Sequence, residues 1–173
     1  MRLGAIRYDV RGGAAVDEVL RLSAANLKAQ GFQLAGAVQI NVPRAGLSRC
    51  DMTIEDLATG KLIEASDRTR TINGCRLDAY ALEDAAGLVA QSIAAETDLL
   101  IINRFGKQES LGQGFRGAIE AAALLGVPVL TSFSAANAAS FEAFSAGCAD
   151  ILPVDCNRIA AWCRDAIDSA RSA

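Results

Sequence analysis

The segment Asp98-Leu-Leu-Ile-Ile-Asn-Arg-Phe-Gly-Lys107 carries the clearest structural signal in the chain. Its four consecutive apolar residues, Leu99 to Ile102, indicate a strand that is buried on both faces, as in a parallel sheet. The strand runs directly into a polar loop that contains a glycine. Ligands of open α/β sheets bind outside the carboxyl ends of such strands. The segment therefore predicts a central parallel strand that leads into a functional loop.

Strand and helix patterns alternate on both sides of this segment. In the first predicted helix, apolar residues from Val16 to Leu27 form the buried face, while Asp17 and the other charged residues lie on other faces. In a later helix, Leu111 is expected on the buried face. This alternation predicts an α/β three-layer sandwich with a mostly parallel sheet. Strands are expected at 4–8, 32–40, 98–103, 127–131 and 149–152, and helices at 15–30, 78–96, 111–125, 136–145 and 155–167.

A β-hairpin at about 49–66 interrupts the parallel plan. Residues 50–57 alternate in polarity with the period of a strand, the Ala58-Thr-Gly60 segment is typical of a tight turn, and 61–66 would return antiparallel. Residues 41–47, which include Pro43, are predicted to form a loop. We therefore expect the hairpin to be an insertion in the sheet or one of its edges.

Composition limits the possible functions. With 173 residues, the chain is expected to be a single domain over 1–173, and its net charge of −3 argues against non-specific nucleic-acid binding. No apolar run approaches the roughly 20 residues that span a membrane, and the amino terminus does not have the pattern of a signal peptide. We therefore expect a cytoplasmic protein that binds neither nucleic acid nor membrane.

The cysteines do not form a metal-binding pattern. The chain has five cysteines, no Cys-x-x-Cys motif and no histidine. A structural zinc site normally uses such ligands and spacings, so no metal is expected. Cys148, Cys156 and Cys163 are expected to be buried or idle thiols.

A first candidate site lies in Tyr8-Asp-Val-Arg-Gly-Gly-Ala-Ala-Val-Asp17. A strand, a glycine turn at Gly12-Gly13 and a helix start follow one another there. Such a turn directs backbone N–H groups and the helix dipole at one point, which suits an oxyanion. The Gly-x-x-x-x-Gly-Lys-Ser/Thr pattern of a true P-loop is missing. A tight turn without a ligand is the alternative interpretation.

A second candidate is Asn103-Arg-Phe-Gly-Lys-Gln-Glu109, followed by Gly112-Gln-Gly-Phe-Arg116. Arg104 and Lys107 lie near the predicted strand end, and Arg116 lies in the next helix. The glycines permit unusual backbone angles. The segment could be an anion cradle or a moving loop over a ligand. A solvated loop, kept soluble by its charges, is the alternative.

A third candidate is the basic segment Asp67-Arg-Thr-Arg-Thr-Ile-Asn-Gly-Cys-Arg76. Guanidinium groups match tetrahedral oxyanions in a bidentate way, so Arg68, Arg70 or Arg76 could close on one. Cys75, beside Arg76, could have a lowered pKa. The alternatives are an exposed basic loop and passive thiols at Cys75 and Cys50.

These motifs together resemble a bacterial family of uncharacterised P-loop-NTPase-like proteins found near molybdenum-transport genes. More distantly, the order of elements resembles the nucleoside-triphosphatase family related to thermophilic enzymes. The resemblance covers nearly the whole chain. It rests on Tyr8-Asp9 with its glycine turn, Gly31-Phe-Gln-Leu-Ala-Gly36, Cys50-Asp-Met52, Asp56-Leu57, Asn73-Gly-Cys-Arg-Leu-Asp78, Asn103-Arg-Phe-Gly-Lys-Gln-Glu109 and Gly114-Phe-Arg116.

The chain departs from those families at the hydrolytic groups. The P-loop lysine and hydroxyl are absent, and Asn103 and Arg104 stand where an acidic pair would end the strand. Only Glu109 and Asp9 are candidates for a general base. Each missing transition-state contact is typically worth a few kcal/mol, so ordinary ATPase action is not expected, whereas nucleotide binding stays open.

Three functional hypotheses follow. The first is a degenerate P-loop-like protein that binds an oxyanion (molybdate, tungstate or phosphate) or a nucleotide, with the resemblance implying molybdenum metabolism. The second is a nucleoside triphosphatase with rearranged catalytic groups. The third is a non-catalytic interaction protein, which could be a homodimer paired through the hairpin edge. The candidate ligand-binding residues are Asp9, Arg11, Gly12, Gly13, Arg70, Cys75, Arg76, Asn103, Arg104, Lys107, Glu109 and Arg116.

Overall fold

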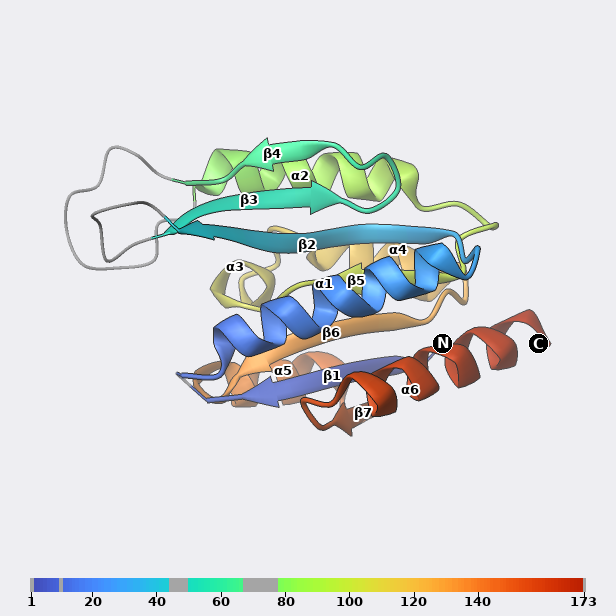
Figure 1. Cartoon of the computed structure of the whole chain (residues 1–173). Coiled ribbons are helices and arrows are strands. Elements are labelled where there is room, and N and C mark those ends of the chain that lie inside the picture. The colour runs from blue at the N-terminus through green and yellow to red at the C-terminus, as the bar shows by residue number, and fades with distance from the viewer. Residues whose placement is uncertain (1, 10, 44–49, 67–77, 173) are drawn as a thin grey trace.

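The computed structural model describes residues 2–9, 11–43, 50–66 and 78–172 (Figure 1). Seven strands form one sheet in the order β4-β3-β2-β5-β6-β1-β7. The strands are β1 (Leu3–Tyr8), β2 (Leu34–Pro43), β3 (Cys50–Asp56), β4 (Leu62–Glu64), β5 (Leu99–Ile102), β6 (Val129–Ser134) and β7 (Ala149–Leu152). The helices are α1 (Gly13–Ala29), α2 (Ala79–Ser92), α3 (Lys107–Ser110), α4 (Arg116–Leu124), α5 (Ala138–Ser145), preceded by the 3₁₀ turn Ala135–Asn137, and α6 (Cys156–Arg171).

Helices cover both faces of the sheet, as the alternating pattern predicted. Figure 1 shows α1 and α6 in front of the sheet and α2, α4 and α5 behind it. In β5 the side chains alternate between the two layers. Leu99 and Ile101 pack with the front helices, and Leu100 and Ile102 pack with the rear ones. All four are fully buried at 0% exposure, which confirms the predicted central strand.

Parallel pairing brings several strand ends to one edge of the sheet. β5 and β1 both pair in parallel with β6, in registers that set Ile102 beside Thr131 and Tyr8 beside Ser134. α1 begins immediately after β1, and α3 follows β5 closely. The loops after β1 and β5 therefore lie at the same, carboxyl edge of the sheet. The α/β fold agrees with a P-loop-NTPase-like sandwich.

The predicted hairpin is confirmed at one margin of the sheet. β3 and β4 pair antiparallel, and β4 is the edge strand. The predicted loop over 41–47 was wrong for its first part, because β2 continues to Pro43. Residues 41–43 pair antiparallel with β3, and Asn41 lies beside Met52. Proline is tolerated there because β2 pairs with β5 only as far as Ala37, so beyond that residue, among the described strands, β2 has a free edge on one side.

The predicted helix over 111–125 was also wrong at its start. The chain instead forms the short α3, a break and then α4, and Leu111 is 64% exposed rather than buried. Gly112 and Gly114 adopt positive φ angles of 84° and 59° in the break. Such angles lie outside the right-handed helical region and favour glycine. The second half of the prediction was right, because Ile119 is buried on α4.

Other boundaries shift less. α2 ends at Ser92, where the next residue, Ile93, is extended with ψ of 121°, so the helix stops short of the predicted residue 96. α6 continues to Arg171, beyond the predicted 167. Within the described residues, no helix has the length and apolar character needed to cross a membrane. The predicted basic loop over 67–76 lies outside the described residues.

Candidate functional site

In the turn between β1 and α1, backbone N–H groups converge on one point, as predicted, and the group that accepts them is the carboxylate of Asp9. Oδ1 of Asp9 accepts hydrogen bonds from the N–H groups of Arg11 at 3.3 Å and Gly12 at 3.1 Å. The Gly12 N–H also donates to the main-chain oxygen of Asp9 at 3.0 Å. One oxygen thus receives two convergent donors, which is the arrangement that an oxyanion oxygen would use. Asp9 and Arg11 are both exposed.

Next to this turn, an ion pair with a buried carboxylate joins α1 to the residues after β5. Asp17 is only 4% exposed. Nη2 of Arg104 donates to both of its carboxylate oxygens, at 2.7 and 2.6 Å, and Nε donates to Oδ1 at 3.2 Å. The sequence analysis placed Asp17 on another face of the helix, and that was wrong. Asp17 faces the sheet because the guanidinium compensates its charge there.

Carboxamide side chains complete the surroundings of Asp17. Nδ2 of Asn103 donates to Asp17 Oδ1 at 2.9 Å, and Nδ2 of Asn41 donates to Oδ2 at 2.9 Å. Nε2 of Gln39 donates to Asn41 Oδ1 at 2.7 Å, and the Gln39 N–H donates to Asn103 Oδ1 at 3.2 Å. We call Asp17, Arg104, Asn103, Asn41 and Gln39 the edge cluster. It joins α1, β2 and the residues after β5.

Sequence analysis missed Asp17, Asn41 and Gln39. For Asp17 a signal existed, because it precedes the buried Leu20 by three residues and Ala24 by seven, which is the spacing of one helix face. For Asn41 the signal was hidden, because the proline two residues later favoured a loop. Asn103 and Arg104 were predicted correctly as the polar pair that ends β5.

Arg104 also connects the two predicted loops. Its Nη2 lies 3.5 Å from the main-chain oxygen of Gly13, and its Cζ lies 5.6 Å from the centre of the Tyr8 ring. A Cβ on Gly13 would lie 3.3 Å from Nη2 of Arg104, so the absent side chain gives the guanidinium its room. The glycine turn after β1 and the loop after β5 therefore meet at one side chain.

The loop that carries Lys107 is fixed by a second buried carboxylate. Glu109 is 4% exposed, and its two oxygens accept hydrogen bonds from the N–H groups of Gly106 at 2.8 Å and Phe115 at 3.1 Å. Burial raises the pKa of Glu109, although these hydrogen bonds oppose the rise. Glu109 therefore holds the loop and faces inward, whereas Lys107 is exposed.

Arg116 is engaged within its own helix, α4, and by α5. Its Nε donates to Oε1 of Glu120 at 2.8 Å, and its Cζ lies 4.9 Å from the centre of the Phe144 ring. The structure thus brings Arg104 to the glycine turn and directs Arg116 to groups of α4 and α5. The predicted residues Arg70, Cys75 and Arg76 lie outside the described residues, and so does Arg68.

Three of the described cysteines are free thiols, one buried and two exposed. Cys163 is buried, and burial raises its pKa to about 12. Cys148 and Cys156 are exposed and free. Across 2–9, 11–43, 50–66 and 78–172, no group of three or more His, Cys, Asp or Glu side chains could hold a metal ion.

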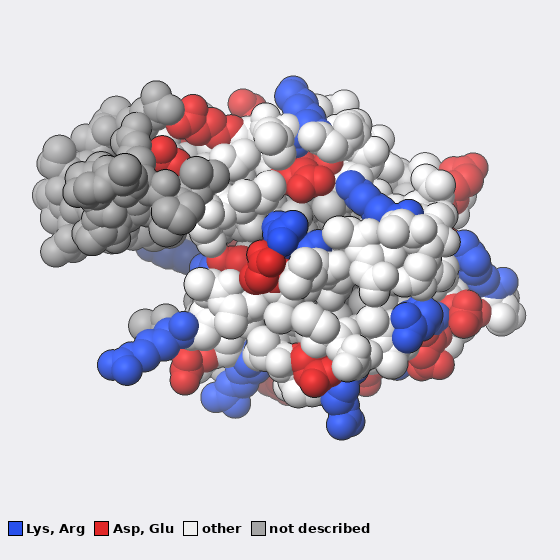
Figure 2. Space-filling view, in the orientation of Figure 1, with Lys and Arg blue, Asp and Glu red and all other residues white. Residues whose placement is uncertain are grey.

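Charges around the site are mixed. On the face shown in Figure 2, Lys and Arg side chains lie among Asp and Glu side chains. A nucleic-acid interface would instead need one continuous basic face. The described part of this face therefore shows no continuous basic surface.

Comparison with known proteins places the chain in a family. Over 165 residues it is 34% identical to "Molybdenum import ATP-binding protein ModC 2" of Bradyrhizobium diazoefficiens; the alignment covers 95% of this chain and 18% of that protein. The chain therefore spans less than a fifth of that relative. No solved structure matches the chain. A family model described as "Protein of unknown function (DUF2478)" matches residues 3–162, so the chain belongs to the DUF2478 family.

Proposed function

We propose that this chain is a degenerate P-loop-NTPase-like domain that binds a small oxyanion or a nucleotide at the carboxyl edge of its sheet, and that it acts in molybdenum metabolism. Molybdate and tungstate are the first ligands to test, because the relative named above is a molybdenum import protein. Phosphate has the same tetrahedral arrangement of oxygens and would use the same donors.

The observation that carries this proposal is the contact of Arg104 with Gly13, at 3.5 Å from guanidinium nitrogen to carbonyl oxygen. It joins the amino end of α1 to the loop after β5, at the edge where open α/β sheets bind ligands. The first turn of α1 directs its N–H groups there, and the helix dipole favours negative charge. The exposed cations Arg11 and Lys107 lie in these two loops.

An incoming anion would compete with Asp9 for the two convergent N–H groups. Asp9 is exposed, so its carboxylate can turn into water when a ligand takes its place. A tetrahedral dianion would gain more from these donors than a monoanion would, because hydrogen bonds strengthen with the charge of the acceptor. We therefore expect weak affinity for chloride and higher affinity for molybdate or phosphate.

Isothermal titration calorimetry on the full chain tests the proposal. Molybdate, tungstate, phosphate, sulfate, ATP and GTP are titrated separately. Arg11→Ala removes an exposed cation, and the loss of a charge-assisted hydrogen bond would raise the Kd about 10- to 100-fold. Asp9→Asn weakens the internal competitor and should lower the Kd.

Arg21→Ala is the matched control. Arg21 is also an arginine of the α1 region, but its guanidinium is paired with Glu18 at 2.7 Å on the helix surface. Its removal should leave the Kd unchanged. Absence of heat with all six ligands at millimolar concentration contradicts the proposed function. An equal loss of affinity in Arg11→Ala and Arg21→Ala contradicts the proposed location.

A further inference from the structure

The edge cluster leaves Asp17 without capacity for a metal ion. Its Oδ1 accepts from Arg104 and Asn103, and its Oδ2 accepts from Arg104 and Asn41, all at 2.6–3.2 Å. The side chain is 5% exposed. A divalent cation could bind these oxygens only by displacing a guanidinium and two carboxamides from a buried position.

Nucleotide hydrolases of this layout need Mg²⁺, held by a P-loop hydroxyl and a carboxylate after a strand. The residues present here do not fit that ion. Ala14 and Ala15 follow the glycine turn, so no hydroxyl stands at the P-loop position, and Asn103 with Arg104 follows β5. The carboxylates that follow β1 and β5 in the chain already accept main-chain N–H groups, Asp9 in the turn and Glu109 in the loop. The edge therefore contains a fixed cation where a metal would be expected.

We propose that the guanidinium of Arg104 is the resident cation of this site, in place of a divalent metal, and that the site takes its ligand as a metal-free anion. Arg104 is tethered, so its single positive charge is always present. The carboxylate of Asp17 is the kind of oxygen ligand that hard divalent cations prefer. Nδ2 of Asn103 and Nδ2 of Asn41 face it, so a metal in place of Arg104 would gain carboxamide ligands only if these groups turned their oxygens toward it. Arg104 occupies the position beside this carboxylate and thereby keeps metal out.

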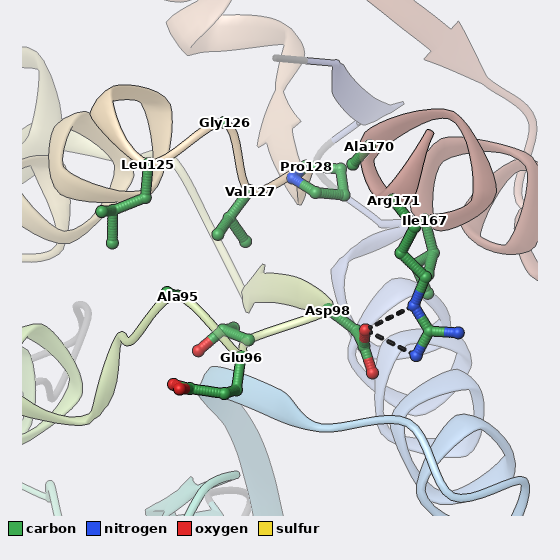
Figure 3. Close-up of a pocket in the computed structure, with 11 residues that line it drawn as sticks. Ala95, Glu96, Asp98, Leu125, Gly126, Val127, Pro128, Ile167, Ala170 and Arg171 are labelled. Atoms are coloured by element: carbon green, nitrogen blue, oxygen red, sulfur yellow. Dashed lines mark hydrogen bonds and ion pairs between the residues drawn. The ribbon is translucent and has the colours of Figure 1, made fainter. Parts of the chain in front are cut away.

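A second ion pair provides an internal control, at the opposite end of β5. Figure 3 shows Asp98, just before β5, bound by Arg171 of α6. The side chain of Asp98 is 9% exposed and lies 2.8 Å from Nη2 of Arg171. Its other oxygen accepts the N–H of Gln33 at 2.8 Å. This pair resembles the Asp17–Arg104 pair, but no carboxamide donates to Asp98 among the described residues.

The experiment removes each arginine and asks whether a metal replaces it. Thermal unfolding of the full-length wild type, Arg104→Ser and Arg171→Ser is measured with and without Mn²⁺, which is also detectable by electron paramagnetic resonance. Only Arg104→Ser should bind Mn²⁺ and be stabilised. With the metal at about a hundred times its Kd, Tm should rise by about 5–10 °C for a chain of this size. Asp17→Asn combined with Arg104→Ser should abolish the shift.

Each result has one meaning. A wild-type Tm shift with Mn²⁺ that is lost in Asp17→Asn overturns the proposal, because the metal then binds beside Arg104. Absence of any metal effect in Arg104→Ser also overturns it. If that variant is unfolded without metal, recovery of the folded state by Mn²⁺ supports the proposal. If it stays unfolded, Arg104→Met, which keeps the aliphatic volume, is measured in the same way, and a lack of metal effect there overturns the proposal.

The claim that the ligand is metal-free rests on the proposed function and is tested separately. If the wild type binds molybdate or ATP, its Kd should be the same with Mg²⁺ and with a chelator. Affinity that requires Mg²⁺ overturns this claim but leaves anion binding intact. If no anion binds at all, the proposed function fails. The Mn²⁺ measurement still decides whether Arg104 stands at a position where a metal ion can bind Asp17.

Discussion

An ion pair lies at each end of β5, and the residue that flanks the strand is the anion in one pair and the cation in the other. Just before the strand, the carboxylate of Asp98 pairs with an arginine of α6. Two residues after the strand, the guanidinium of Arg104 pairs with an aspartate of α1. Both aspartates are largely buried. Arg171, however, is 57% exposed, whereas Arg104 is 35% exposed and stands among carboxamides. The comparison shows that the surroundings, rather than the pair itself, determine what an ion pair can do.

The largest expected difference between the two ends is in stability. Arg104→Ala would leave Asp17 charged, buried and unpaired, which typically destabilises a protein by about 3–5 kcal/mol. The free energy of unfolding from urea denaturation measures this loss. Adding Asp17→Asn should recover part of it, because the uncompensated charge is removed. A loss below about 1 kcal/mol would show that the surroundings of Asp17 solvate its charge without Arg104.

A smaller loss of stability is expected on substitution of Glu109. This carboxylate lies at the same carboxyl edge of the sheet but, among the described residues, accepts only main-chain N–H groups. In Glu109→Gln one of the two N–H groups, of Gly106 or Phe115, would face an amide donor. An unsatisfied buried hydrogen-bonding group costs about 1–3 kcal/mol, measured by the same denaturation. Glu120→Gln, at an exposed position of α4, is the control and should change the free energy little.

The contribution of Glu109 to stability should also depend on pH. Because burial raises its pKa in the folded state, the folded protein binds this proton more tightly than the unfolded chain does. Its contribution to stability is therefore full below the unfolded pKa and is lost as pH rises through the folded pKa. The stability difference between wild type and Glu109→Gln should shrink as pH rises above about 4.3. A difference that grows would show that the pKa is lowered instead.

The smallest effect is expected at the amino end of β5. Arg171→Ala removes an exposed partner, and surface ion pairs contribute about 0–1 kcal/mol. The contact of its Cζ with the Phe32 ring, at 5.5 Å, adds a similar small amount. The loss should shrink in high salt, because exposed charges are screened. A loss as large as that of Arg104→Ala would remove the distinction between the two ends.

The sequence predicted β5 and the sheet well, because burial on two faces leaves a continuous apolar run that local pattern detects. The spacing of Asp17 fits the buried face of α1, but its charge argued against that position and its partner could not be assigned from local pattern. A charged residue on an amphipathic helix normally faces water, and its partner Arg104 is 87 positions away in the chain. Only the folded sheet brings the two together. The break at Gly112 and Gly114 had a local signal, but the apolar spacing around it also fitted one longer helix.

The candidate site was predicted in outline. The meeting of the glycine turn with the loop after β5 followed from the parallel layout. The group with which each charged side chain interacts did not follow from it. Asp9 and Glu109 were considered as possible bases, and the structure shows both accepting main-chain N–H groups. Both sets of contacts are local, because Asp9 accepts from residues two and three positions later and Glu109 from residues three earlier and six later. Such spacings are signals of turns and helix caps, but the sequence analysis considered these two residues only as bases or ligands.

The pairing of β1 has a consequence for synthesis on the ribosome. β1 is the first strand of the chain, yet its neighbours are β6 and β7, near the other end. The growing polypeptide cannot finish this sheet until those late strands have emerged, and such long-range pairing slows folding. The β3–β4 hairpin can form early by itself. Nascent chains halted before residue 129 should therefore expose the apolar side of β1 and depend most on chaperones.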